Sequence, residues 1–152
     1  MSIKSDLHIL SYDLELLTDK LRKVWQDFVA GKITPDTAGK LMYTENAELD
    51  AKIGKLGVVH IYKGRGEIMK FLDWITKRTQ PGPLDCTTEL ETSTQLTRNC
   101  IAFIDTNFGT IVLDLENTIN KGDKRIEKTV LKVCNGPHPR SNYPFFETVP
   151  FR

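Results

Sequence analysis

Residues 84–134, LDCTTELETSTQLTRNCIAFIDTNFGTIVLDLENTINKGDKRIEKTVLKVC, decide the fold of this chain. From Leu84 to Leu96, apolar residues, threonines and a cysteine occupy every second position, and mostly acidic or polar residues fall between them. This alternation predicts a strand with one buried face. The segment from Cys100 to Ile104 is apolar at both parities, which predicts a central strand covered on both faces.

Two short connections join further strands in the same stretch. Residues 107–109 (Asn-Phe-Gly) and 120–123 (Asn-Lys-Gly-Asp) contain residue types that tolerate positive φ. They flank a strand predicted over residues 111–116, and a last strand is predicted over residues 126–133. Strands with connections this short must be antiparallel neighbours, so the stretch is predicted to be an antiparallel meander.

The chain before the meander contains both helical and strand patterns. Leucines at three- and four-residue intervals predict a helix over residues 6–30, with Ser5 as its N-cap. This stripe fits a coiled-coil partner or, in the interpretation we favour, a helix laid across the sheet. The other predicted elements are helices over residues 35–42 and 67–78 and strands over residues 47–53 and 58–62.

Length and charge restrict the class of protein. At 152 residues and 39% hydrophobic content, the chain predicts one domain, of a size that buries roughly 70% of its unfolded surface. The net charge is +1, from 21 basic and 20 acidic residues in no long block, so no nucleic-acid partner is expected. No apolar run approaches the ~18 residues of a membrane span. The N-terminus lacks the apolar core of a signal peptide, so we expect no membrane partner and a cytoplasmic or nuclear location.

Neither the cysteines nor the glycines follow the spacing of a metal site or a nucleotide-binding loop. Cys86, Cys100 and Cys134 are odd in number, widely spaced and inside predicted strands, which favours reduced core thiols in a cytosolic or nuclear protein over disulfides or a metal site. Residues 64–66 (Gly-Arg-Gly) follow a predicted strand but lack the third glycine of a dinucleotide loop. The sequence also contains no P-loop, HExxH or CxxC pattern, so we expect no cofactor and no metal.

Two short motifs stand out among these elements, Tyr43–Leu49 (YTENAEL) and Ile61–Ile68 (IYKGRGEI). Together with the order of elements, they resemble the nuclear transport factor 2-like superfamily, and the second motif is similar to that family's Y-x-G-R-x-x-I segment. The resemblance covers about residues 5–134 and implies an α+β cone, in which a curved antiparallel sheet wraps around N-terminal helices and encloses a cavity. Members of this superfamily include isomerase-like enzymes, dehydratases, ligand binders and protein-interaction domains, so the resemblance implies a fold more than a function.

The resemblance also implies where isomerase-like catalytic groups would lie. The general-base aspartate of such enzymes corresponds to Ala51, the oxyanion-site aspartate to Leu115, and the helix tyrosine to Val24 or Trp25. None of these residues carries the required group. The nearest carboxylates are one position away, and a one-residue slip turns a strand side chain to the opposite face.

A binding or protein-interaction domain is the function we favour, with a small apolar ligand or a protein as its partner. The candidate ligand-binding residues are Trp25, Phe28, His60, Tyr62 and Asp114. The alternative is a small isomerase- or dehydratase-like enzyme in which His60 works with Asp114 or Asp50 as an acid–base pair. Against this acid–base pair we favour the interpretation in which His60 is a hydrogen-bonded structural residue and Asp114 points toward solvent.

Two surfaces suggest contacts beyond the core. Ile101 and Phe103 share one parity of their strand, so they lie on one face of the sheet. Only one face of the sheet can cover the helices, so the other, outer face needs a partner surface. We therefore expect a homodimer through the outer face. Residues 1–134 are predicted to form the domain. Residues 135–152 are rich in proline and aromatic residues and are predicted to be an extended strap on that domain. A proline-rich peptide offered to another protein is the alternative for this extension.

Overall fold

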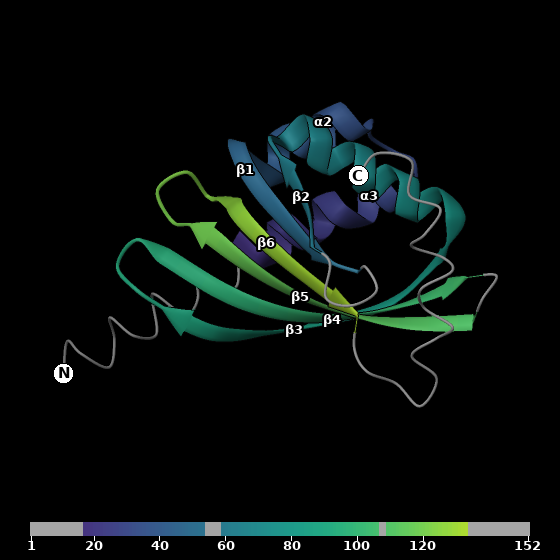
Figure 1. The fold of residues 1–152 in the computed structure, drawn as a ribbon. Coiled ribbons are helices and arrows are strands. Elements are labelled where there is room, and N and C mark those ends of the chain that lie inside the picture. The colour runs from purple at the N-terminus through teal and green to yellow at the C-terminus, as the bar shows by residue number, and fades with distance from the viewer. Residues whose placement is uncertain (1–16, 54–58, 107–108, 134–152) are drawn as a thin grey trace.

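The computed structural model describes residues 17–53, 59–106 and 109–133 (Figure 1). The predicted extension, Cys134, and the predicted start of the first helix lie outside these residues. Residues 17–29 are helical. The elements that follow are α2 (Pro35–Met42), β1 (Tyr43–Lys52), β2 (His60–Lys63), α3 (Arg65–Arg78), β3 (Gln80–Glu91), β4 (Gln95–Thr106), β5 (Gly109–Asn120) and β6 (Arg125–Val133).

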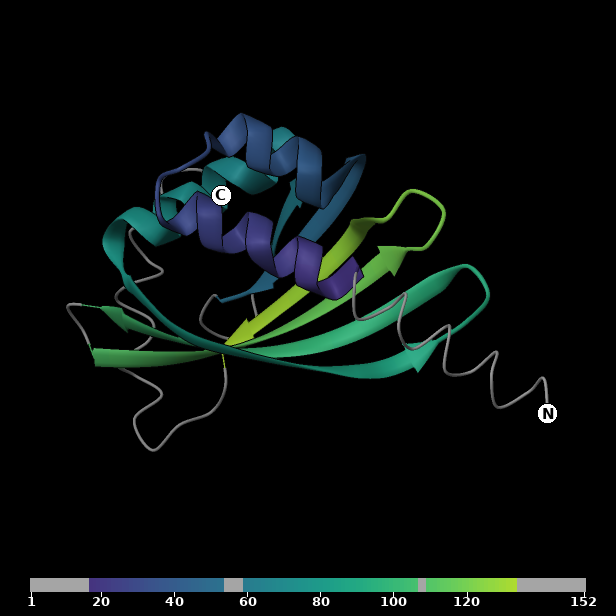
Figure 2. The same ribbon diagram turned by 180° about the vertical axis from the view of Figure 1, so that it is seen from behind.

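The strands form one six-stranded sheet in the order β2-β1-β6-β5-β4-β3. Only the β1–β6 pair is parallel among these neighbours. The sheet curves, and the helices lie over its concave side, which we call the inner face (Figures 1 and 2). The predicted α+β architecture and the antiparallel meander from β3 to β6 are therefore confirmed.

Local signals set the ends of the helices as predicted. The first helix ends at residue 29. Gly31, two residues further on, turns the chain with a φ of 76°, a backbone conformation that glycine adopts without strain. Thr34 caps α2, because its side chain accepts a hydrogen bond of 3.1 Å from the Thr37 N–H. Pro35 occupies the first turn of α2, where its missing N–H has no consequence.

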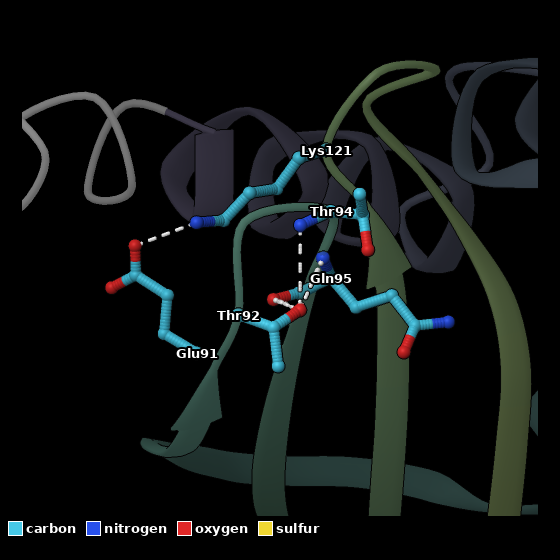
Figure 3. A network of polar contacts seen from close by, with 5 residues as sticks. All are labelled: Glu91, Thr92, Thr94, Gln95 and Lys121. Atoms are coloured by element: carbon cyan, nitrogen blue, oxygen red, sulfur yellow. Dashed lines mark hydrogen bonds and ion pairs between the residues drawn. The ribbon is translucent and has the colours of Figure 1, made fainter.

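The predicted single strand from Leu84 to Leu96 is wrong, because the chain turns at residues 92–94 and starts β4 at Gln95. The Thr92 hydroxyl oxygen accepts hydrogen bonds from the N–H groups of Thr94 (3.3 Å) and Gln95 (3.0 Å), as Figure 3 shows. Lys121, in the turn between β5 and β6, makes an ion pair of 2.6 Å with Glu91. Threonine and serine in this turn keep the alternating pattern of a strand, which conceals the turn in the sequence.

The prediction that residues 100–104 form a strand covered on both faces of the sheet is also wrong. Cys100 and Ile104 are buried on the inner face, but Phe103, of the opposite parity, is 38% exposed. β4 lies between β3 and β5, second from the edge of the sheet, and the helices cover only one face. Apolar residues at both parities therefore mark an exposed apolar outer face here.

A disulfide joins Cys86 and Cys100, so the predicted reduced thiols are wrong for this pair. The two cysteines are direct partners in the β3–β4 register. Both lie at equal distances along the chain from Ser93, in the middle of the turn that the sequence pattern concealed. Without that turn, the two residues cannot be recognised as opposite each other.

The core lies between α3, the other helices and the inner face of the sheet. All four residues predicted for the inner side of α3 are buried, namely Ile68, Phe71, Leu72 and Ile75. The Phe71 ring stacks on Tyr62 of β2, with the ring centroids 4.5 Å apart. No helix within the described residues is long and apolar enough to cross a membrane.

Candidate functional site

A cavity of about 140 Å³ lies between the helix over residues 17–29, α3 and the inner face of the sheet. Most of its lining is apolar. The inward-facing apolar side chains of the lining are Leu21, Trp25, Met42, Leu72, Ile75, Ala102, Ile104, Leu113, Leu115, Ile119, Ile126 and Leu131. Other lining residues are Thr18, Arg22, Tyr43, Thr76, Thr79, Arg98 and Asn117, together with the bonded Cys86 and Cys100.

A chain of hydrogen bonds crosses the inner face beside this cavity. Thr129, fully buried on β6, donates its hydroxyl proton to Asn117 Oδ1 on β5 at 2.6 Å. The Tyr43 and Thr129 hydroxyl oxygens are 3.4 Å apart. Since Thr129 has a single hydroxyl proton, Tyr43 is the donor in that contact. Burial raises the pKa of the Tyr43 hydroxyl above 10.0, against a smaller lowering by Thr129, so the chain stays protonated at neutral pH.

Two arginines bring positive charge to the same cavity. Arg98, on β4, is partly buried, whereas Arg22, on the first helix, has a side chain that is 41% exposed. Burial lowers the pKa of Arg98, the nearby charge of Arg22 lowers it further, and Asp19 opposes both. Asp19 lies 4.0 Å from Arg22 and is itself 69% exposed. A guanidinium keeps its proton in proteins, so both arginines remain cations.

Trp25 is the one candidate ligand-binding residue that lines the described cavity. Phe28, one turn further along the same helix, is buried in the core, and its ring centroid is 5.7 Å from that of Trp25. Tyr62 is also buried, against Phe71. A ligand-binding role for these aromatic residues stays a prediction, and the structure places Trp25 where it can serve one.

The sheet register separates the candidate acid–base pair. His60 pairs with Ala51, which pairs with Leu131, so all three point to the inner face. Asp114 follows Leu113 and precedes Leu115, which both line the cavity, so it points to the outer face. Asp50 also lies on the outer face, where its Oδ2 is 3.5 Å from Lys128 Nζ. His60 therefore shares no face with either carboxylate.

The positions that correspond to isomerase catalytic groups carry apolar side chains. Leu115 and Trp25 line the cavity, and Ala51 is fully buried in β1. Among the residues that the structure describes, no aspartate, glutamate or histidine lines this cavity. The polar groups that do line it are hydroxyls, one amide and two guanidiniums, and these bind and orient more readily than they exchange protons at neutral pH.

The fold is shared with solved structures of low sequence identity. An NTF2-like protein with a cystatin-like fold from Novosphingobium aromaticivorans is 16% identical, with a TM-score of 0.54 over 87% of this chain and 93% of that one. The chain has the nuclear transport factor 2-like fold. A protein from Bacillus subtilis provisionally named an isomerase is 14% identical, with a TM-score of 0.54 over 78% of this chain and 88% of that one.

A third solved structure is similar in fold to this chain. It is the phenazine biosynthesis-related protein of Pseudomonas aeruginosa, 13% identical, with a TM-score of 0.53 over 86% of this chain and 85% of that one. No protein-family model matches the sequence, and no curated protein is similar to it. The resemblance seen in the sequence motifs is thus confirmed for the fold.

Sequence reasoning missed Arg98 and Asn117 as cavity residues. Arg98 continues the parity of Leu96 and precedes Cys100 at that parity, both of which are buried on the inner face. Asn117 likewise follows Leu113 and Leu115 at every second position. A polar residue at an inward parity was the signal that could have identified both.

Proposed function

We propose that this protein binds a small, largely apolar molecule in the cavity between its helices and its sheet. The observation that carries the proposal is the lining, in which apolar side chains predominate and polar groups are few. This composition is typical of ligand pockets, where a few polar groups fix the orientation of an apolar ligand.

The size of the cavity restricts what enters it. Its volume of about 140 Å³ is close to the roughly 150 Å³ of an engineered apolar cavity that binds benzene. A single aromatic ring or a branched aliphatic group of similar volume therefore fits. A longer molecule would have to extend out of the cavity, and Arg22 is an exposed residue of its lining.

The enzyme alternative, with His60 and Asp114 or Asp50, gains less support from this geometry. One structural neighbour is provisionally named an isomerase, but a fold is shared by enzymes and binding proteins alike. General acid–base catalysis needs groups within hydrogen-bond reach of the substrate, and His60 shares no face of the sheet with Asp114 or Asp50. Binding is therefore the function we put forward.

Filling the cavity tests this proposal. We expect Leu115→Trp to weaken benzene binding at least about 10-fold, because the larger ring occupies the space that the ligand needs. Val112→Trp is the matched control, since Val112 is on the same strand but pairs with Phe103 on the outer face. Binding is measured by calorimetric titration or by chemical-shift changes. Equal affinities in the wild-type protein and a folded Leu115→Trp variant would contradict the proposal.

We also propose that the outer face of the sheet forms a homodimer. Phe103 is 38% exposed there, and Ile101 on the same strand and Val112, the partner of Phe103 on β5, share that face. Exposed apolar patches of this kind mark contact surfaces. We expect Phe103→Asp to shift the protein toward the monomer in sedimentation equilibrium, because a carboxylate is costly to bury in an apolar contact. A wild-type mass that is monomeric at every concentration would exclude the dimer.

A further inference from the structure

The β4–β5 register places a cation and an amide side by side in the cavity. Arg98 and Asn117 are direct partners in that antiparallel pair, so their side chains lie next to each other on the same face. Both line the cavity. The row continues across β6, where Thr129 is the partner of Asn117.

The hydrogen-bond chain fixes which end of Asn117 is offered to a ligand. Thr129 donates to Asn117 Oδ1, and Tyr43 donates to Thr129, so every proton in the chain points toward the amide oxygen. The amide group therefore keeps its Nδ2 and two N–H donors, for which no described residue acts as acceptor. Because Tyr43 and Thr129 are buried, the chain holds the amide in this orientation without competition from water.

Arg98 is a cation without an adjacent counter-charge among the described residues. No described carboxylate lies within ion-pair distance of its guanidinium, and Arg22 adds charge of the same sign. A partly buried cation of this kind is unfavourable alone, and an anion that enters the cavity would relieve the cost. The acid that acts on Arg98, Asp19, is exposed and lies against Arg22.

We infer that Arg98 and Asn117 bind the carboxylate head group of the ligand, whose apolar body fills the rest of the cavity. The inference rests on the proposed binding function and adds the class of ligand, a small apolar carboxylic acid. A guanidinium presents paired N–H donors in one plane, which match the two oxygens of a carboxylate. Arg22, which is exposed, contributes attraction at longer range rather than a buried contact.

Three probes that each contain one benzene ring distinguish the contribution of the carboxylate head group from that of the apolar body. Benzene tests the apolar cavity alone, benzoate adds a carboxylate, and benzamide is a neutral group of the same shape. We expect the wild-type protein to bind benzoate about 10- to 100-fold more tightly than benzamide, the range for hydrogen bonds to charged groups. Titrations are done in a buffer free of carboxylates and phosphate, which would compete for the arginines.

Substitutions then assign the effect to Arg98. We expect Arg98→Met to abolish the preference for benzoate over benzamide and to leave benzene binding within about twofold, because methionine keeps an apolar stem. Arg78→Met is the matched control, since it removes the same charge from α3 at a residue outside the cavity lining. Arg22→Met removes the more exposed of the two cations in the lining and should reduce the preference about threefold. It provides a readout if Arg98→Met does not fold.

The outcomes distinguish this inference from the function on which it rests. If benzene binds but wild-type protein does not prefer benzoate to benzamide, the head-group assignment is overturned and the binding function stands. The assignment also fails if a folded Arg98→Met variant, or Arg22→Met in its place, keeps the full wild-type preference. If none of the three probes binds, both the proposed function and the head group are overturned.

Discussion

Replacing Phe71 with alanine is expected to cost about 3–5 kcal/mol of unfolding free energy, the usual range for a large buried aromatic residue. Phe71 is fully buried in α3 and stacks on Tyr62, with the ring centroids 4.5 Å apart. Because α3 packs on β1 and β2, which form one end of the sheet, the cavity that alanine leaves lies between layers that cannot close on each other. The loss is therefore a large fraction of the total unfolding free energy of a domain, which is about 5–15 kcal/mol.

Urea unfolding followed by circular dichroism measures this loss. Lys70→Ala is the control, because Lys70 is exposed on the same helix and its substitution should change the unfolding free energy by less than about 0.5 kcal/mol. A Phe71→Ala variant with the stability of the Lys70→Ala variant would show that α3 does not anchor the sheet as the structure indicates.

The helices and the meander were predictable because their signals are local. Thr34 and Pro35 mark the start of a helix by chemistry that acts within one turn. The hairpin turn at residues 121–124 follows from Asn120, whose Oδ1 accepts a hydrogen bond of 2.9 Å from the Asp123 N–H. The inner side of α3 follows from the helical period alone. None of these predictions needs knowledge of which strands become neighbours.

The candidate site was less predictable because it depends on pairing between distant strands. His60 and Asp114 each stand out in an apolar segment, but only the register shows that they lie on opposite faces. Arg98 and Asn117 look like surface residues when each strand is read alone. They become a pair because β4 and β5 place them opposite each other, and turn geometry together with the buried face sets that register.

The concealed turn at residues 92–94 has the widest consequences. The segment Thr92-Ser93-Thr94 keeps polar and β-branched residues at positions that suit a strand, so periodicity alone reads through it. The error shifts every expectation about the partners of β3. It hides the Cys86–Cys100 disulfide. The disulfide removes the argument from reduced thiols that supported a cytoplasmic or nuclear location. That location stays a prediction.

Reduction of the Cys86–Cys100 disulfide is expected to lower the unfolding free energy by about 3 kcal/mol, the loop-entropy value for a closed loop of roughly 15 residues. The separation here is 14 residues. β3 lies at the edge of the sheet formed by the described residues, so within that sheet the bond constrains a strand whose one neighbour is β4. Both cysteines also line the cavity, so reduction should weaken ligand binding as well as the fold.

Unfolding curves with and without a phosphine reductant measure the effect, and alkylation followed by mass spectrometry counts the free thiols in each sample. A Cys86→Ser/Cys100→Ser double variant should match the reduced protein. Cys134→Ser is the matched control, because it removes the third cysteine and keeps the bonded pair, so its stability should still fall on reduction. Unfolding free energies that are the same in oxidised and reduced protein would mean that the disulfide contributes nothing to holding β3 on the sheet. The hairpin turn at residues 92–94, with its Thr92 hydrogen bonds, would then be sufficient for that pairing.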